Sequence, residues 1–536
     1  MSHSDVVIAG GGLAGLTLAR QLKQEQPNLS IFVAEKRPHP VPEAAFKVGE
    51  SSVEIGAHYF QKILGLDPYL RSDQLEKLGL RYFFPFDGNR DIARRLELGP
   101  ARFPPVPSFQ LDRGRFENYL LRTIKEQGID VVDGAVVRSI TLGPDRHTVS
   151  VQHDGHVFDV TGRWLVDASG RSGLLRRQLG STRASTHLAS AAWFRVSSRL
   201  KVDDWSTDPA WLARVPSRER WLSTNHLMGR GYWVWLIPLS SGSTSVGIVV
   251  DSTIHPYDRI NRLERALGWL REFEPQCAEV VDAHAGQVED FLALKQYAHG
   301  CERVYSPDRW LLTGEAGVFT DPFYSPGSDF IGMSNDFIAE IILRDMRGDD
   351  VSACIEVFNS TYLRLFDAFI RLYDGQYRLM GNAQVMTVKA AWDNGCYWAI
   401  TAPLFFQRRY RDAGFIGSIE PLMRRFFVLH ARVQGLLRAW DAADASSYAD
   451  AWANVMDVDV LRRWQADLAG PALDDETLRM MLGRNLETLE GFARAIQDLA
   501  SRTDVDLARF VSTGPSPDAF DIKPFTFTPV PSPVEA

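Results

Sequence analysis

The sequence predicts an α/β protein in which a Rossmann-like dinucleotide-binding domain carries an inserted antiparallel β-sheet domain and a helical C-terminal region. Three observations predict it. The N-terminus reads as strand, glycine turn, helix and strand, the middle alternates apolar and polar residues, and the last third has helical spacing. A chain of 536 residues is long enough for two or three joined domains.

The N-terminal unit begins with a short apolar strand over 5–9 (DVVIA). The turn GGGLAG follows, then a helix over 16–22 and a second strand over 31–34 that ends at Glu35. Strand, glycine turn, helix and strand in this order form a βαβ unit. The sequence therefore predicts a parallel pair of strands with the glycine turn at its carboxyl edge.

The glycine turn has the GxGxxG spacing of a dinucleotide site. Gly10 permits the tight turn, Gly12 lets the backbone approach a pyrophosphate, and Gly15 lets the helix pack closely on the strand. Glu35 would accept hydrogen bonds from a ribose hydroxyl, and an acid there disfavours a 2′-phosphate. The residues of this unit expected to bind the cofactor are Gly10, Gly12, Leu13, Ala14, Gly15, Glu35 and Lys36.

Later segments complete the predicted organisation. The segments VVRSITLG, HTVSVQHDG and VFDVTGRWLVDAS alternate and predict an antiparallel meander. In GYWVWLIPLSS, the side chains of Trp233, Trp235 and Ile237 share one face of a half-buried strand that Pro238 ends. The expected parts are a discontinuous dinucleotide domain (1–180 and 300–345), a β-sheet substrate domain (181–299), a helical domain (346–515) and a Pro-rich tail lying extended over the surface or partly disordered (516–536).

Composition excludes several classes of function. The formal charge is −8 and no basic stripe is present, so nucleic-acid binding is not expected. No apolar run is long enough for a membrane span, and no secretory signal precedes the first strand, so a cytoplasmic protein is expected. The four cysteines lie far apart, which favours free thiols over a disulfide framework or a metal site.

Several segments resemble a known family. WLVDASGRSGLLRRQLG and WLLTGEAGVFTDPFYSPGSDF resemble the second and third flavin motifs of the FAD-dependent monooxygenases, whose fold is the GR2 or p-hydroxybenzoate hydroxylase-like one. WVWLIP fits the WxWxIP motif of flavin-dependent halogenases within that superfamily, and KVGESSVEIG resembles their GES region. The chain thus resembles flavin-dependent halogenases, and it resembles the phenol and pyrrole branch more than the enzymes for free tryptophan.

The resemblance implies a cofactor and a reaction. FAD would arrive as FADH₂ from a separate flavin reductase, and O₂ and halide would yield hypohalous acid. A lysine would direct it onto an electron-rich phenol, pyrrole or carrier-tethered aromatic in secondary metabolism. Lys77 is the expected lysine, because burial would lower its pKa, and Lys47 is a second candidate. The resemblance adds cofactor contacts at Gly49, Glu50, Ser51, Arg113, Gly314, Glu315, Pro326 and Gly327, and a screen between flavin and substrate at Trp233, Trp235, Ile237 and Pro238.

One departure from the family supports an alternative. The family's halide site uses two successive backbone N–H groups that align with Pro326 and Gly327, with Ser325 beside them. Proline has no N–H, and a lost hydrogen bond to an anion costs about 1.5–3 kcal/mol. Asp329 would also repel halide if it faced the site, and Tyr324 replaces an acid of the tryptophan enzymes. The alternatives are therefore an aromatic monooxygenase that has lost halide binding, and a flavoprotein module without turnover of its own.

Two further groups of residues have a structural and a functional interpretation. Core packing is the favoured explanation of an abundant set of aromatic residues, although a ring-binding pocket would use the same types. That set is Phe83, Phe84, Phe86, Trp392, Tyr397 and Trp398. A carrier protein would need a basic docking patch, to which Arg408, Arg409, Arg424 and Arg425 are possible contributors.

Overall fold

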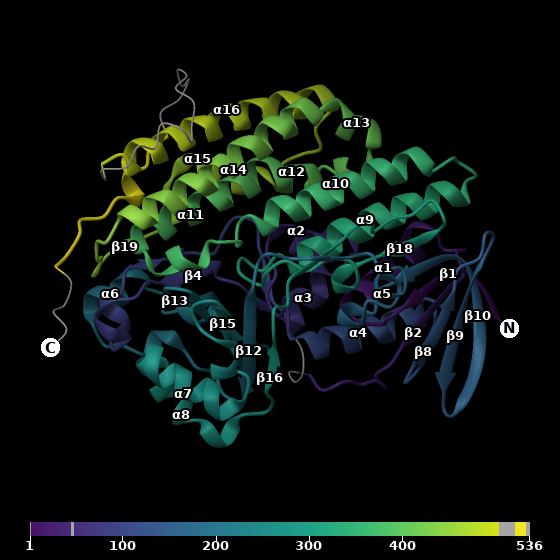
Figure 1. Ribbon diagram of the computed structural model, residues 1–536, viewed down its shortest axis with the longest axis horizontal. Coiled ribbons are helices and arrows are strands. Elements are labelled where there is room, and N and C mark those ends of the chain that lie inside the picture. The colour runs from purple at the N-terminus through teal and green to yellow at the C-terminus, as the bar shows by residue number, and fades with distance from the viewer. Residues whose placement is uncertain (1, 44–47, 503–519, 532–536) are drawn as a thin grey trace.

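The computed structural model describes residues 2–43, 48–502 and 520–531. Two β-sheets lie side by side, and a layer of C-terminal helices covers both of them (Figure 1). Strand β1, which begins the described chain, lies at the right of Figure 1, and the last described residues lie at the opposite end. The predicted combination of a Rossmann-like part, a second sheet and a helical region is confirmed.

The first sheet contains the βαβ unit and the antiparallel meander. Its strand order is β7-β2-β1-β10-β9-β8, with β18 beside β10. Strand β1 runs parallel to β2 and β10, while β8, β9 and β10 are antiparallel, as predicted. The strands are β1 (Ser2–Ala9), β2 (Ile31–Glu35), β7 (Asp130–Asp133), β8 (Val136–Thr141), β9 (His147–His153), β10 (His156–Asp167) and β18 (Trp310–Leu312). The accompanying helices are α1 (Leu13–Glu25), α4 (Arg113–Glu126) and α5 (Leu174–Gln178).

The second sheet has the order β16-β12-β15-β14-β13-β4-β5-β19. Three of its strands, β4, β5 and β19, come from outside the 181–299 range expected for the sheet domain. The strands are β4 (Leu80–Phe83), β5 (Glu97–Leu98), β12 (Ala189–Val196), β13 (Thr224–Gly229), β14 (Tyr232–Pro238), β15 (Thr244–Asp251), β16 (Leu292–Leu294) and β19 (Trp452–Ala453). Small pairs join β3 (Leu75–Glu76) to β6 (Phe109–Gln110) and β11 (Thr182–Ala184) to β17 (His299–Cys301).

Strand β14 is central in this sheet, and the prediction that it is half-buried was wrong. All seven of its residues are buried. Trp233 and Trp235 join the large core that faces the first sheet, whereas Val234 and Leu236 join a separate core. Helices α6 (Pro209–Arg214), α7 (Leu263–Phe273) and α8 (Pro275–Asp282) supply side chains to that second core. The alternation therefore separates two apolar environments rather than core from solvent.

The C-terminal half is mainly helical through Ala500, as predicted. The helices of this layer are α9 (Gly327–Met346), α10 (Ser352–Ile370), α11 (Ala383–Cys396), α12 (Ala402–Phe406), α13 (Ala413–Ser418), α14 (Glu420–Ala443), α15 (Asp459–Asp467) and α16 (Asp475–Ala500). The two remaining α-helices of the described chain are short, α2 (Glu54–His58) and α3 (Asp67–Asp73). The described part of the tail packs against the layer, because Phe520 stacks on Phe492 and Phe525 is fully buried. This differs from an extended tail lying only on the surface.

The described ranges contain no candidate for a membrane-spanning helix and no candidate metal-binding cluster. None of the helices in these ranges has the length and apolar character that a bilayer crossing requires. The same residues bring no three His, Cys, Asp or Glu side chains together as metal ligands. All four cysteines are buried free thiols.

Candidate active site

A large cavity lies where the glycine turn, the GES segment, β14 and the first turn of α9 meet. Most of the predicted cofactor residues line it. From that set, the wall contains Gly12, Leu13, Ala14, Gly49, Glu50, Ser51, Arg113, Gly314, Glu315 and Gly327. Segments that lie far apart in the sequence thus meet around one space, which we call the cofactor cavity.

The glycine turn has the shape that a dinucleotide requires. A Cβ atom on Gly10 would lie 2.3 Å from the carbonyl oxygen of Ala168, and one on Gly15 would lie 1.9 Å from the carbonyl oxygen of Gly10. A Cβ atom on Gly12 would meet nothing within 4 Å. Gly10 and Gly15 are therefore needed for packing, whereas Gly12 leaves open space beside the free N–H groups at the start of α1. These residues fit the pyrophosphate of FAD.

Glu35 and Lys36, two of the predicted cofactor contacts, lie outside the described wall of the cofactor cavity. The Glu35 carboxylate accepts hydrogen bonds from the backbone N–H of Gly11 at 2.7 Å and of Arg37 at 2.9 Å. It is buried beneath the turn and, like the exposed Lys36, is not part of the described wall of the cofactor cavity. Glu35 therefore fixes the glycine turn, and a hydrogen bond to ribose would need one of its remaining lone pairs.

The charged residues of the cavity wall are held by partners. Arg113 donates to the carbonyl oxygen of Val48 at 2.6 Å and to Glu117 at 2.6 Å. Glu50 forms a buried ion pair with Arg195 at 2.8 Å, and burial raises the pKa of Glu50 despite that partner. Burial also raises the pKa of Glu315. Their side chains are therefore oriented before any cofactor binds.

The WxWxIP strand forms one side of this cavity. Trp233, Trp235 and Ile237 line it, and Pro238 ends the strand outside the described wall. The indole N–H of Trp233 donates to the Tyr377 hydroxyl at 2.9 Å, and Tyr377 donates to Asp321 at 2.7 Å. No sequence pattern indicates this support, because Trp233, Asp321 and Tyr377 come from distant segments.

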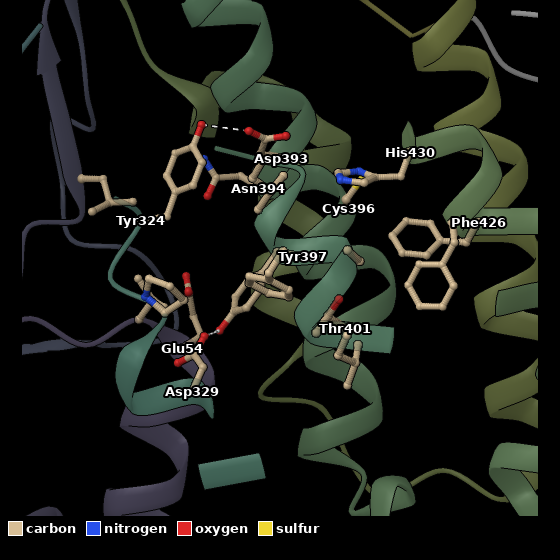
Figure 2. A pocket seen from close by; sticks show the side chains of 18 residues that line it. Glu54, Tyr324, Asp329, Asp393, Asn394, Cys396, Tyr397, Thr401, Phe426 and His430 are labelled. Carbon is tan, nitrogen blue, oxygen red and sulfur yellow. Dashed lines mark hydrogen bonds between the residues drawn. The ribbon is translucent and has the colours of Figure 1, made fainter. Parts of the chain in front are cut away.

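A second, mainly apolar cavity lies beyond the first turn of α9 (Figure 2). Its wall contains residues of α2, α9, α10, α11 and α14. Polar side chains lie at both ends, with Glu54 and Asp329 at one end and His430 on α14 at the other (Figure 2). We call this space the helical cavity. Sequence reasoning did not find it.

The segment from Tyr324 to Asp329 divides the two cavities. Tyr324, Pro326 and Asp329 line the helical cavity, whereas Ser325, Gly327 and Ser328 line the cofactor cavity. Tyr324 and Ser325 have positive φ values of 69° and 59°. Left-handed backbone at non-glycine residues costs of order 1–3 kcal/mol each and is concentrated at functional sites. The strained turn therefore directs alternate side chains into different spaces.

Lys77 lies between groups that line the two cavities, although the described lining of neither cavity includes Lys77 itself. It is almost fully buried, and its ammonium donates to the Ser51 hydroxyl at 2.9 Å and to the Ser52 carbonyl oxygen at 2.8 Å. Burial lowers the pKa of Lys77 to about 7, although the charges of Glu54 and Asp329 oppose this shift. Ser51 belongs to the cofactor cavity, and the two acids belong to the helical cavity.

Asp329 faces the helical cavity and not the cofactor cavity. Its carboxyl accepts hydrogen bonds from the Gly56 N–H at 2.7 Å and from the Tyr397 hydroxyl at 2.7 Å (Figure 2). Burial raises the pKa of Asp329 to about 8, so that the carboxyl is mostly neutral near pH 7. The repulsion of halide that the sequence suggested is correspondingly weak.

The remaining candidate residues from the sequence are the four arginines of the docking patch, the aromatic set and Lys47. Each of the four arginines proposed for a docking patch has an acidic partner within 3 Å. Arg408 pairs with Asp336, Arg409 with Asp475, Arg424 with Glu420 and Arg425 with Glu490. Among the aromatic residues, Phe83, Phe84, Trp392 and Trp398 are buried as expected, whereas Tyr397 lines the helical cavity. Lys47 lies outside the described residues.

Comparison with known proteins gives a consistent result. The family model described as tryptophan halogenase matches residues 101–381, and an NAD(P)-binding Rossmann-like model matches residues 8–72. Flavin-dependent halogenase chlA of Dictyostelium discoideum is 26% identical over 443 residues, which cover 76% of this chain and 71% of that protein. A 1H-pyrrole-2-carbonyl-[peptidyl-carrier protein] chlorinase of Pseudomonas fluorescens is 24% identical over 65% of this chain and 77% of its own length.

Solved structures show the same fold. Halogenase PltM in complex with phloroglucinol and FAD has a TM-score of 0.60 at 16% identity, covering 92% of this chain and 98% of that one. The flavin-dependent halogenase CmlS has a TM-score of 0.55 at 20% identity, covering 94% and 78%.

The fold, the cofactor cavity and these relatives define an FAD-dependent enzyme of the oxidoreductase type. The matched family model spans more than half of the chain. The chain belongs to the flavin-dependent halogenase family.

Proposed function

We propose that this protein uses FADH₂, O₂ and halide to halogenate an electron-rich aromatic compound, with Lys77 as the catalytic lysine. The position of Lys77 carries the proposal. Its amine donates to Ser51 of the cofactor cavity, and its charge is influenced by Glu54 and Asp329 of the mainly apolar helical cavity. FAD, when reduced, supplies the electrons that activate O₂. The chain's own residues bind the cofactor, separate it from the ring and hold the lysine.

Lys77 is suited to polarising hypohalous acid. With a pKa of about 7, its amine can donate a proton to the departing oxygen and take one back near neutral pH. Glu54 and Asp329 lie close enough to influence its charge. The Trp233 and Trp235 side chains would keep the substrate ring on the other side of the partition, which disfavours direct hydroxylation.

Halide binding needs donors that replace the missing N–H of Pro326. Gly327 and Ser328 begin α9 and line the cofactor cavity. The helical hydrogen bonds of α9 begin with the Phe330 N–H, which donates to the Pro326 carbonyl oxygen. The buried Ser328 hydroxyl has no hydrogen-bond partner among the described residues. We infer that Gly327 N–H and Ser328 Oγ–H provide the halide site, one residue later than in the family pattern.

Hydroxylation is the second candidate, and Pro326 is the observation that favours it. If the Ser328 hydroxyl does not replace the lost donor, halide affinity falls and oxygen transfer to the ring becomes the dominant outcome. The same two cavities would then serve an aromatic monooxygenase.

The substrate proposal is a small free aromatic compound. Relatives include enzymes named for pyrroles on peptidyl carrier proteins. In this chain, however, the arginines considered for docking a carrier are neutralised by internal ion pairs. That pairing favours free substrate over a carrier-bound one. A separate flavin reductase would supply FADH₂.

The test is halide incorporation with chemically reduced FAD, bromide, O₂ and a panel of phenols and pyrroles. We expect a monobrominated product from the wild-type protein and loss of at least about 100-fold in rate for Lys77→Met, because general acid–base groups contribute that much or more. Lys62→Met is the matched control, because this lysine is exposed and lies away from both cavities. A product heavier by one oxygen atom and insensitive to bromide would contradict halogenation, and NADPH oxidation by the protein alone would contradict the separate reductase.

A further inference from the structure

A buried polar cluster lies behind the wall of the helical cavity. The Tyr324 hydroxyl donates to Asp393 at 2.9 Å (Figure 2). Asp393 also pairs with the Lys389 ammonium at 2.7 Å and accepts from the Gln434 amide at 2.7 Å. Lys389 donates in turn to Gln434 at 2.8 Å. Lys389 is fully buried, and Asp393 is 6% exposed.

Packing of the helices does not require this cluster. Helix α11 is buried along almost all of its length, and apolar residues would fill the same positions. Replacing a buried ion pair by apolar residues of similar volume is often neutral or stabilising, so the pair is poor evidence for a structural role. Two members, Tyr324 and Asp393, reach the cavity wall, and Tyr324 is held there by strained backbone.

The hydrogen bonds leave one position open toward the cavity. Asp393 is occupied by three donors, from Tyr324, Lys389 and Gln434. A tyrosine hydroxyl has one hydrogen to donate and can also accept. Tyr324 uses its hydrogen on Asp393, and no group in the described ranges donates to its oxygen. The cluster therefore presents an acceptor to a ligand that carries an O–H group.

We propose that Tyr324, supported by Asp393 and Lys389, binds the hydroxyl of a phenolic substrate and accepts its proton during ring substitution. This inference rests on the proposed function and deepens it by naming the substrate class. Tyr324 is the catalytic residue, since it touches the substrate, and Asp393 and Lys389 position it. Glu54 and Asp329, which line the same cavity, act on the charge of Lys77.

The proton balance closes with the residues present. The phenol hydroxyl gives its proton to Tyr324 as Tyr324 gives its own to Asp393. The ring carbon forms a bond to the halogen of hypohalous acid, the oxygen–halogen bond breaks, and the hydroxide takes a proton from the Lys77 ammonium to become water. The ring then loses its C–H proton to the neutral Lys77 amine and regains its O–H proton from Asp393 through Tyr324. The net change is phenol plus hypohalous acid to halophenol plus water.

Other groups at the cavity are consistent with this assignment. Burial raises the pKa of Tyr324 well above its ordinary value, so the tyrosine passes a proton rather than remaining ionised. Burial lowers the pKa of His430 to about 4, so the histidine that lines the same cavity is neutral. A relay that ends in a carboxylate requires a substrate hydroxyl that has a proton to transfer, as a phenol has. An aryl methyl ether has no proton to offer.

A binding experiment tests the relay without halogenation. The oxidised FAD holoenzyme is titrated with 4-nitrophenol, whose phenolate form has its own visible absorption, over a range of pH. For the wild type we expect the bound phenol to ionise at a lower pH than free 4-nitrophenol. Tyr324→Phe should lose this shift, and Tyr397→Phe, which removes a different hydroxyl from the same cavity, should retain it. A wild-type protein that binds only the neutral phenol, or an unchanged shift in Tyr324→Phe, would overturn the proposal.

Turnover provides the second measurement. Under halogenation conditions the wild type should prefer a phenol to its methyl ether, and Tyr324→Phe should lower the phenol rate by about 100-fold or more while the ether rate changes little. An equal loss for both substrates would indicate a merely structural role and contradict the relay. Absence of halogenation in every protein would count against the proposed function alone, because the nitrophenol titration uses neither halide nor O₂.

Discussion

The cofactor cavity and the helical cavity share one partition, the segment from Tyr324 to Asp329, yet they are built in different ways. The cofactor cavity is formed largely by turns and helix starts, where glycine is required by close backbone approach. The helical cavity is lined by side chains on five helices, and α2 precedes the other four by more than 260 residues in the sequence. Backbone geometry therefore fixes what binds on one side, and individual side chains determine what binds on the other.

Gly15 and Gly12 of the GxGxxG turn provide the strongest test of a site that is built by the backbone. Gly15→Ala would place Cβ 1.9 Å from the Gly10 carbonyl oxygen, and overpacking of that kind costs about 1–3 kcal/mol or more. We expect loss of both fold stability and FAD binding. Gly12→Ala is the matched variant, because its φ of −81° suits alanine and its Cβ meets only open space.

Gly12→Ala should leave the unfolding free energy of the FAD-free protein within about 0.5 kcal/mol of wild type, as is usual for changes that disturb no packing. It should weaken FAD binding at least about tenfold, because the added methyl occupies the space expected for the pyrophosphate. Urea denaturation and flavin fluorescence titration measure the two quantities. Equal FAD affinity in Gly12→Ala and wild type would show that the cofactor lies elsewhere.

The contrast between the cavities also marks the limit of sequence reasoning. The GxGxxG spacing and the WxWxIP alternation predicted residues that line the cofactor cavity, because glycine requirements and strand period are local properties. Glu35 was assigned to the cofactor by spacing, yet it binds the backbone of the turn. Core packing was favoured over ring binding for Tyr397, and Asp393 gave no usable indication, because polar or aromatic residues on a buried helix have no period that reveals a cavity between helices. Only the packing of α9, α11 and α14 brings them together.

Lys77 should make stability depend on pH. In the unfolded chain its amine titrates near the ordinary 10.5, whereas in the folded protein burial lowers the pKa to about 7. Between these values the unfolded chain binds more protons, so the unfolding free energy attributable to Lys77 rises with pH, by up to about 1.4 kcal/mol per pH unit. Asp329 acts oppositely and only below about pH 8, where its raised folded pKa lets the native state bind the extra proton.

Urea denaturation of wild type and Lys77→Met between pH 8 and 10 isolates the lysine. The wild type should gain stability relative to Lys77→Met as pH rises through this window. Parallel curves for the two proteins would mean that the amine keeps an ordinary pKa, and the acid–base role proposed for Lys77 would then lose its physical basis.

The smallest expected effect concerns the partition itself, where the Ser328 side chain is proposed to replace the backbone donor that Pro326 lacks. Ser328→Ala removes the unpartnered hydroxyl and leaves the Gly327 N–H in place. A hydrogen bond to an anion is worth about 1.5–3 kcal/mol, so the apparent bromide affinity should fall by roughly 10- to 100-fold. FAD affinity and FADH₂ reoxidation should stay unchanged, which separates halide binding from a general disturbance of the cavity.

The Ser328 hydroxyl fits only because residue 56 is glycine, since a Cβ there would lie 2.3 Å from Ser328 Oγ. Gly56→Ala should therefore displace the same hydroxyl and weaken bromide binding similarly, while leaving Ser328 in the sequence. If bromide dependence is unaltered in both variants, the halide is not held by Ser328, and this edge of the cofactor cavity is backbone-built like the rest.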